Sequence, residues 1–216
     1  MSKGAFRTTR KWRIISRPAV AVPVAIDHSA LLDDVVAVAR KAHAATAGWR
    51  AICVRAQRTV GKKVVQPIST LDLDEEIPGL ARRVSAIVRR APSEIDTLVF
   101  GLFDGIDDDG KGVYTGFHVG GTAGFDAENR PLTVAPSWLP ADRFLKSAAL
   151  DAIARASVLA RGESKKAVAH GLRFGAAALL ARFASEELPY RVVVTFDNGD
   201  FAQISEGGGA LSLRGS

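Results

Sequence analysis

The stretch IDTLVFGLF, residues 95–103, decides the fold because it gives the strongest strand signal in the chain. Valine, isoleucine, threonine and phenylalanine favour strands, and the run is bounded by Pro92 before it and by an acidic turn after it. A second run, VYTGFHV at 113–119, returns from that turn. The two runs therefore predict a β-hairpin.

Two further pairs of runs have the same form. Residues 49–57 and 63–68 are separated by a turn around Gly61, and residues 190–196 and 201–205 are separated by the sequence DNGD. Asn-Gly is a strong signal for a tight hairpin turn. We therefore predict three hairpins in all.

Apolar residues at helical spacing lie between these hairpins. They predict four helices, over residues 29–46, 78–90, 141–161 and 164–185. Acidic residues precede the second helix, where the helix dipole favours negative charge: Asp72, Asp74, Glu75 and Glu76.

The resulting order, α-ββ-α-ββ-αα-ββ, predicts the α+β class. Because strands joined as hairpins pair antiparallel, we expect an antiparallel sheet built from three hairpins with four helices packed on it. A chain of 216 residues is expected to form a single domain. We place that domain at 27–206, after a basic leader at 1–26 and before a flexible C-terminal tail at 207–216.

The net charge of +6 lies entirely in the leader, whose six basic residues are accompanied by no acidic one. Three interpretations of the leader stay open: an organelle transit peptide, an arm that contacts polyanions, or a solvated tail with an edge strand at 11–16. The candidate polyanion contacts are Arg7, Arg10, Lys11, Arg13 and Arg17. The neutral body argues against a nucleic-acid-binding domain, so nucleic acid would be contacted only through the leader.

The body is neutral but unevenly charged. Residues 91–151 hold ten acidic and four basic residues, whereas residues 152–182 hold six basic residues and one acidic. No run of 18 apolar residues occurs, so no membrane span is predicted. We predict a cytoplasmic location, with organelle import as the alternative if the leader is a transit peptide. The oligomeric state stays open.

Sequence motifs for catalysis or metal binding fail on inspection. GIDDDGKG at 105–112 approaches a phosphate-binding loop, but Gly112 replaces the magnesium-binding hydroxyl and three aspartates would repel phosphate. As an EF-hand it lacks carboxylates at the first and last positions. The single cysteine, Cys53, excludes a disulfide within the chain and a multi-cysteine zinc site. We interpret Cys53 as a small packed hydrophobe on a strand, and we predict neither a metal nor a cofactor.

The candidates for partner binding gather around the second hairpin. They comprise an acidic turn, nearby aromatic and histidine side chains, and a tryptophan in a proline-flanked loop: Asp104, Asp107, Asp108, Asp109, Tyr114, His118 and Trp138. An exposed acidic turn could attract a basic partner, and loop aromatics are frequent binding hot spots. Alternatively, His118 and Asp104 could form an acid–base site.

The same region resembles bacterial immunity proteins of polymorphic toxin systems, over roughly residues 95–155. The resemblance lies in FGLFD at 100–104, the acidic turn, YTGFH at 114–118, WLP at 138–140, and then Phe144, Ser147, Leu150 and Ile153. It implies a cytoplasmic, non-catalytic protein that binds and blocks a toxin. The basic leader departs from the compact, often acidic members of such groups.

Three functions follow as hypotheses. The first is a non-catalytic protein that binds a basic protein surface, such as a toxin, through the acidic hairpin turn and its neighbouring aromatics. The second is an enzyme with its site around His118 and Asp104. The third is an organelle-imported or nucleic-acid-contacting protein that acts through its leader.

Overall fold

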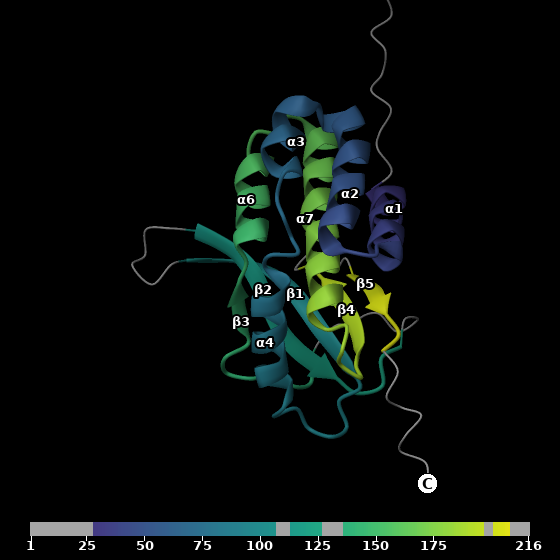
Figure 1. Ribbon diagram of the computed structural model, residues 1–216, viewed down its shortest axis with the longest axis vertical. Helices are drawn as coiled ribbons and strands as arrows, with labels where there is room; N and C mark the ends of the chain where they lie inside the picture. Colours follow the sequence, from purple (N-terminus) through teal and green to yellow (C-terminus); the bar gives the residue numbers. More distant parts are fainter. Residues whose placement is uncertain (1–27, 107–112, 127–135, 197–200, 208–216) are drawn as a thin grey trace, which may run out of the picture.

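The computed structural model describes residues 28–106, 113–126, 136–196 and 201–207. Within them the chain forms an α+β fold of six helices and one five-stranded sheet (Figure 1). The helices are α1 (His28–Lys41), α2 (Ala45–Val60), α3 (Lys62–Ser69), α4 (Ile77–Val88), α6 (Ala148–Ser157) and α7 (Glu163–Ala184). The strands are β1 (Thr97–Ile106), β2 (Val113–Thr122), β3 (Phe144–Lys146), β4 (Arg191–Thr195) and β5 (Phe201–Ser205). The leader with its polyanion candidates, Asp107, Asp108, Asp109 and the tail beyond Gly207 lie outside the described residues.

The sheet is mixed, which corrects the expected antiparallel sheet of three hairpins. Its order is β3-β2-β1-β4-β5. The predicted β1–β2 and β4–β5 hairpins form, but β4 pairs with β1 in the parallel direction, with Thr97 opposite Arg191 and Gly101 opposite Thr195. Between β2 and β4 the chain passes through β3, α6 and α7. Such a crossover through helices returns the chain parallel to a strand that it left earlier.

The main core lies between the sheet and the helices. Leu98, Phe100 and Leu102 project from β1 on the face that contacts the helices, and each is at most 1% exposed. Helix α7 is central to this layer, because it packs against α1, α2, α4, α6 and β4. Residues 176–181 of α7 are fully buried, as expected for a helix that is apolar on all sides. Across the described ranges, no helix has the length and apolar character needed to cross a membrane.

The expected first hairpin is wrong, because residues 49–57 and 63–68 belong to α2 and α3. Trp49, Ile52 and Ala56 share one buried side of α2, and this helix packs against α7. The Trp49 indole donates a hydrogen bond of 2.8 Å to the Ile68 carbonyl oxygen. Gly61, at a positive φ of 83°, ends α2 and separates it from α3. The predicted turn therefore exists, but it joins two helices.

The expected helix over 141–161 is also partly wrong. Residues 144–146 of this range form β3, which pairs with Gly116–His118 at the outer edge of β2. Ser147 then caps α6, accepting a hydrogen bond of 3.2 Å from the Leu150 amide. The expected helices at 78–90 and 164–185 are confirmed as α4 and α7, and the helix expected at 29–46 ends earlier, at Lys41.

Candidate partner-binding surface

Strand alternation divides the predicted site residues between the two faces of the sheet. Because neighbouring side chains on a strand point to opposite faces, Asp104 lies on the helix-covered face, with Phe100 and Leu102. Tyr114 and His118 are paired with Gly105 and Gly101, so they project from the opposite face. The second hairpin thus carries two separate groups of side chains.

Asp104 is tied into the structure on its own face. Its Oδ1 accepts a hydrogen bond of 2.7 Å from the Thr115 hydroxyl and another of 2.8 Å from Arg173 Nη2 on α7. These contacts anchor the hairpin to the helix layer. The structure does not bring His118 and Asp104 together, because the two side chains project from opposite faces of the sheet.

The opposite face carries a cluster of three aromatic rings, which we call the ring face: Phe103, Tyr114 and Phe144. The Phe103 ring packs edge-on against Tyr114, with centroids 5.6 Å apart, and against Phe144 at 5.0 Å. Phe103 and Tyr114 are half-buried, whereas Phe144 is 50% exposed. A solvent-facing aromatic cluster of this kind is typical of an interaction surface.

Two cations border the ring face. Lys146 Nζ lies 4.4 Å from the Tyr114 ring centroid, and Arg143 Cζ lies 4.4 Å from that of Phe144. Each charge sits at a distance suited to a cation–π contact. The rings therefore keep defined orientations although one of them is half exposed.

Glycines provide the room for these rings. A Cβ atom on Gly105 would lie 2.6 Å from the Tyr114 ring and 2.9 Å from the Phe103 ring. A Cβ atom on Gly101 would lie only 1.9 Å from the His118 ring. Alternation of glycine with rings along one face of each strand is visible in the sequence. It is the signal that could have revealed Phe103 as a site residue.

The ring face continues onto a two-stranded arm. Residues 104–106 and 113–115 pair with each other, and no other described strand pairs with them. The pairing of β1 with β4 ends at Gly101, and the pairing of β2 with β3 begins at Gly116. Figure 1 shows this end of the hairpin projecting from the sheet. Ile106 and Val113 are 69% and 67% exposed. By strand alternation these two side chains project from the face opposite the ring face, so the arm exposes an aliphatic pair on one face and Tyr114 on the other.

Trp138 does not join the ring face. Its backbone exchanges two hydrogen bonds of 3.0 Å with Gly121, near the other end of β2. Its side chain is half-buried and packs against the core. Of the seven predicted partner-binding residues, the structure thus places Tyr114 and His118 on one face and separates Asp104 and Trp138 from them. Asp107, Asp108 and Asp109 lie in the connection outside the described residues.

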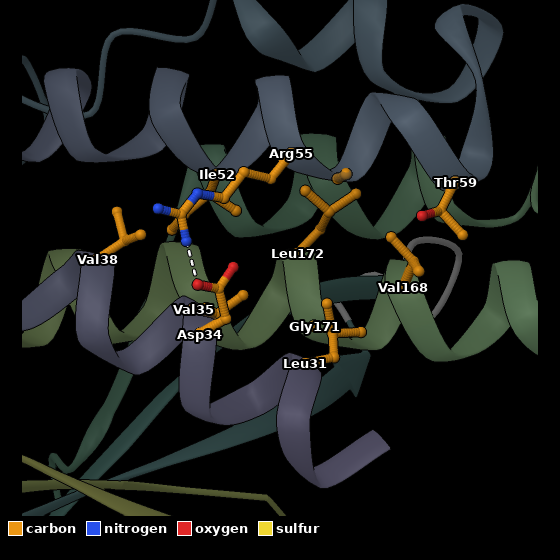
Figure 2. A pocket seen from close by; sticks show the side chains of 11 residues that line it. Leu31, Asp34, Val35, Val38, Ile52, Arg55, Thr59, Val168, Gly171 and Leu172 are labelled. Atoms are coloured by element: carbon orange, nitrogen blue, oxygen red, sulfur yellow. Dashed lines mark hydrogen bonds and ion pairs between the residues drawn. The ribbon is translucent and has the colours of Figure 1, made fainter. Parts of the chain in front are cut away.

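The helix layer holds a separate pocket of about 160 Å³ between α1, α2 and α7. Its walls are mostly aliphatic, and the Asp34–Arg55 ion pair lies at its side (Figure 2). Thr59 is the other polar side chain in the lining. The described residues contain no group of three histidine, cysteine or acidic side chains that could hold a metal ion.

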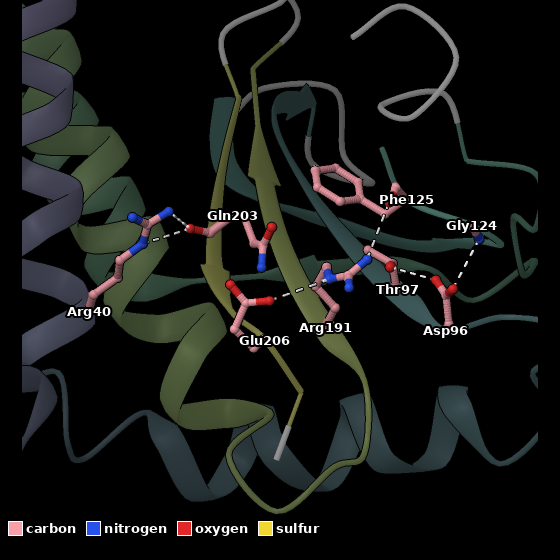
Figure 3. Close-up of polar contacts among 8 residues, drawn as sticks. All are labelled: Arg40, Asp96, Thr97, Gly124, Phe125, Arg191, Gln203 and Glu206. Carbon is pink, nitrogen blue, oxygen red and sulfur yellow. Dashed lines mark hydrogen bonds and ion pairs between the residues drawn. The ribbon is translucent and has the colours of Figure 1, made fainter. Parts of the chain in front are cut away.

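Several polar contacts lie on and around the strands β4 and β5 (Figure 3). Arg40 of α1 donates to the Gln203 carbonyl oxygen from both Nε, at 2.9 Å, and Nη2. On β4, the Arg191 guanidinium lies 5.5 Å from the Phe125 ring centroid. Asp96 accepts from the Gly124 amide at 3.0 Å. The Arg40 contact occupies one carbonyl oxygen of β5, an edge strand that would otherwise offer this group to another chain.

Comparison of the chain with protein-family models, with curated proteins and with solved structures found no match.

Proposed function

We propose that this protein binds a protein partner, without catalysing a reaction, through the ring face and the arm of the β1–β2 hairpin. The observation that carries the proposal is the solvent-facing cluster of Phe103, Tyr114 and Phe144. The exposed Ile106 and Val113 lie at the end of the same hairpin, on its other face. Aromatic anchors surrounded by apolar contacts commonly dominate the binding energy of protein interfaces.

The sequence that connects β1 to β2 supports a basic partner. It holds three aspartates and one lysine: Asp107, Asp108, Asp109 and Lys111. Complementary charge raises the rate at which proteins associate and disfavours wrong partners. The resemblance over residues 95–155 supports a toxin as that partner, and the protein is then a cytoplasmic immunity protein.

Site-specific photocrosslinking in the native host tests the surface. A photoreactive phenylalanine analogue placed at position 144 is expected to crosslink one discrete partner. The same analogue at position 54, on the exposed surface of α2, serves as the control because Val54 is 62% exposed. Equal crosslinking from both positions would place the partner elsewhere.

With the partner in hand, calorimetry measures the contribution of the rings. We expect Phe144→Ser to raise Kd at least tenfold, equivalent to about 1.4 kcal/mol, and Val54→Ser to leave Kd unchanged. Replacing Asp107, Asp108 and Asp109 with alanine is expected to slow association at low salt, with a smaller effect at high salt. Wild-type affinity in the Phe144→Ser variant would refute the proposal.

A further inference from the structure

One end of the helix layer is strongly basic. Figure 1 shows the end of α2, helix α3, the end of α6 and the start of α7 meeting at the top of the view, and α3 packs against both α2 and α6. Six basic residues lie in these segments, all of them exposed, and we call them the basic end: Arg58, Lys62, Lys63, Arg161, Lys165 and Lys166. In segments 57–66 and 158–167, Glu163 is the one acidic residue.

Two exposed aliphatic side chains accompany this charge. Val158 and Leu159 follow α6 in the turn toward α7, and they are 71% and 58% exposed. Few large apolar side chains of the described residues are exposed to this degree. Because most of each side chain is exposed, burial in the core does not account for this apolar pair.

The positions of the lysines are unfavourable for helix stability. Lys62 and Lys63 begin α3, whose first turn has no acidic residue, and Lys165 lies in the first turn of α7. The positive end of the helix dipole repels cations there. An anionic surface facing this end would offset both the dipoles and the lysine charges.

We propose that the basic end docks on the surface of an anionic lipid bilayer, with Val158 and Leu159 entering the headgroup region. Lysine and arginine clusters of this size bind anionic leaflets, each residue raising binding roughly fivefold near the surface. Aliphatic side chains gain by entering the boundary between headgroups and acyl chains. This inference goes beyond the proposed function and does not depend on it.

A nucleic acid is the other polyanion to consider, and the composition of the surface disfavours it. Segments 57–66 and 158–167 contain no aromatic residue, so they offer no ring on which a base could stack. Val158 and Leu159 would gain nothing against a phosphate backbone. An anionic bilayer would interact favourably with both features of the surface, the basic charge and the aliphatic pair.

Vesicle sedimentation of the full chain tests the docking, with phosphatidylcholine vesicles prepared with and without phosphatidylglycerol. Because the leader is basic as well, the comparison is between variants of equal net charge. We expect Lys62→Ala/Lys63→Ala to lower partitioning onto the anionic vesicles about 25-fold. The control Lys41→Ala/Arg89→Ala removes the same charge from exposed residues elsewhere and is expected to bind like the wild type. Equal partitioning of the two variants would overturn the proposal.

Insertion of the aliphatic pair is tested separately. Because Cys53 is buried, a Leu159→Cys variant can be labelled selectively with an environment-sensitive fluorophore. Its emission is expected to rise on anionic vesicles, and Val158→Ser/Leu159→Ser is expected to weaken partitioning severalfold. An unchanged emission would refute insertion. If Lys62→Ala/Lys63→Ala weakened binding to a short DNA duplex and left vesicle binding intact, the basic end would be a nucleic-acid surface and the bilayer proposal would fail.

Discussion

At the scale of single residues, the acidic side chains before α4 make hydrogen bonds to helices other than the one they precede. Asp74 accepts hydrogen bonds from the amides of Ala45, at 2.9 Å, and Thr46, at 3.3 Å, and so caps the start of α2. Glu76 accepts from the Ala149 amide at the start of α6. Two of the four carboxylates that were expected to favour the dipole of α4 therefore accept hydrogen bonds from the backbone of other helices.

The neighbouring Asp72 is affected by the same arrangement. The hydrogen bond of 2.6 Å from the Thr46 hydroxyl holds the pKa of Asp72 below its ordinary value. Because the folded pKa is lowered, the associated stability is present at neutral pH and is lost as acid protonates the carboxylate.

Cys53 gives a prediction at this scale, because burial raises the pKa of its thiol to about 12. In the native protein the thiol is expected to react with a thiol reagent far more slowly at mildly alkaline pH than in denaturant. The thiol of an unfolded cysteine has its ordinary pKa of 9.0, so folding stability falls as the pH rises from there toward the folded pKa. Cys53→Ala is expected to remove that part of the pH dependence in urea titrations. Equal labelling rates in the native and unfolded states would contradict the buried thiol.

At the scale of secondary-structure elements, α1 and α3 carry basic residues at opposite ends of the helix. Helix α1 ends with Arg40 and Lys41 in its last turn, where cations are favourable. Helix α3 begins with Lys62 and Lys63, and its N-cap residue Gly61 supplies no side-chain hydrogen bond. The charges at the C-terminus of α1 therefore favour helix stability, and those at the N-terminus of α3 do not.

Reversing the charge at each of these two helix ends tests how each charge interacts with its helix dipole. We expect Lys63→Glu to raise the free energy of unfolding by about 0.3–1 kcal/mol, because the dipole then attracts the side chain. Lys41→Glu makes the same change of net charge at a helix C-terminus and is expected to lower it by a similar amount. Urea denaturation at low salt measures both, and a loss of stability in Lys63→Glu would show that the lysine is there for packing.

At the scale of the whole molecule, α7 organises the fold because its glycines let other helices approach closely. A Cβ atom on Gly175 would lie 2.6 Å from Val35 Cγ1 on α1 and 2.8 Å from Ile52 Cδ1 on α2. Since protein interiors are close-packed, neither neighbour can give way without moving its helix. The contact therefore joins three helices at one point.

This contact predicts opposite effects for two glycine substitutions in helices. Gly175→Ala is expected to lower the free energy of unfolding by about 1–3 kcal/mol through overpacking, although alanine favours helices. A Cβ atom on Gly79 in α4 would meet no neighbouring atom within 4 Å, so Gly79→Ala is expected to raise stability by up to about 1 kcal/mol. Both are measured by urea denaturation. A stabilising Gly175→Ala would show that the three helices are loosely packed.

Local patterns were sufficient for several parts of this molecule. Runs of strand-favouring residues on both sides of a turn predicted the β1–β2 and β4–β5 hairpins, and period-3.6 spacing predicted α4 and α7, because in each case the signal lies within one continuous segment. The placement of Tyr114 and His118 on one strand was likewise predictable. Their separation from Asp104 follows from alternation once the strand register is known.

The sequence by itself thus determined the α+β class, two hairpins and the neutral character of the body, since each depends on residues close together in the chain or on composition. The tertiary structure decided the rest. Residues 49–57 mix arginines with Trp49, Ile52 and Val54, a short apolar run that suits either a strand or a helix, and packing against α7 selects the helix. The parallel pairing of β4 with β1 joins segments about ninety residues apart, and no local pattern can specify contacts that form only after the helices between them have packed.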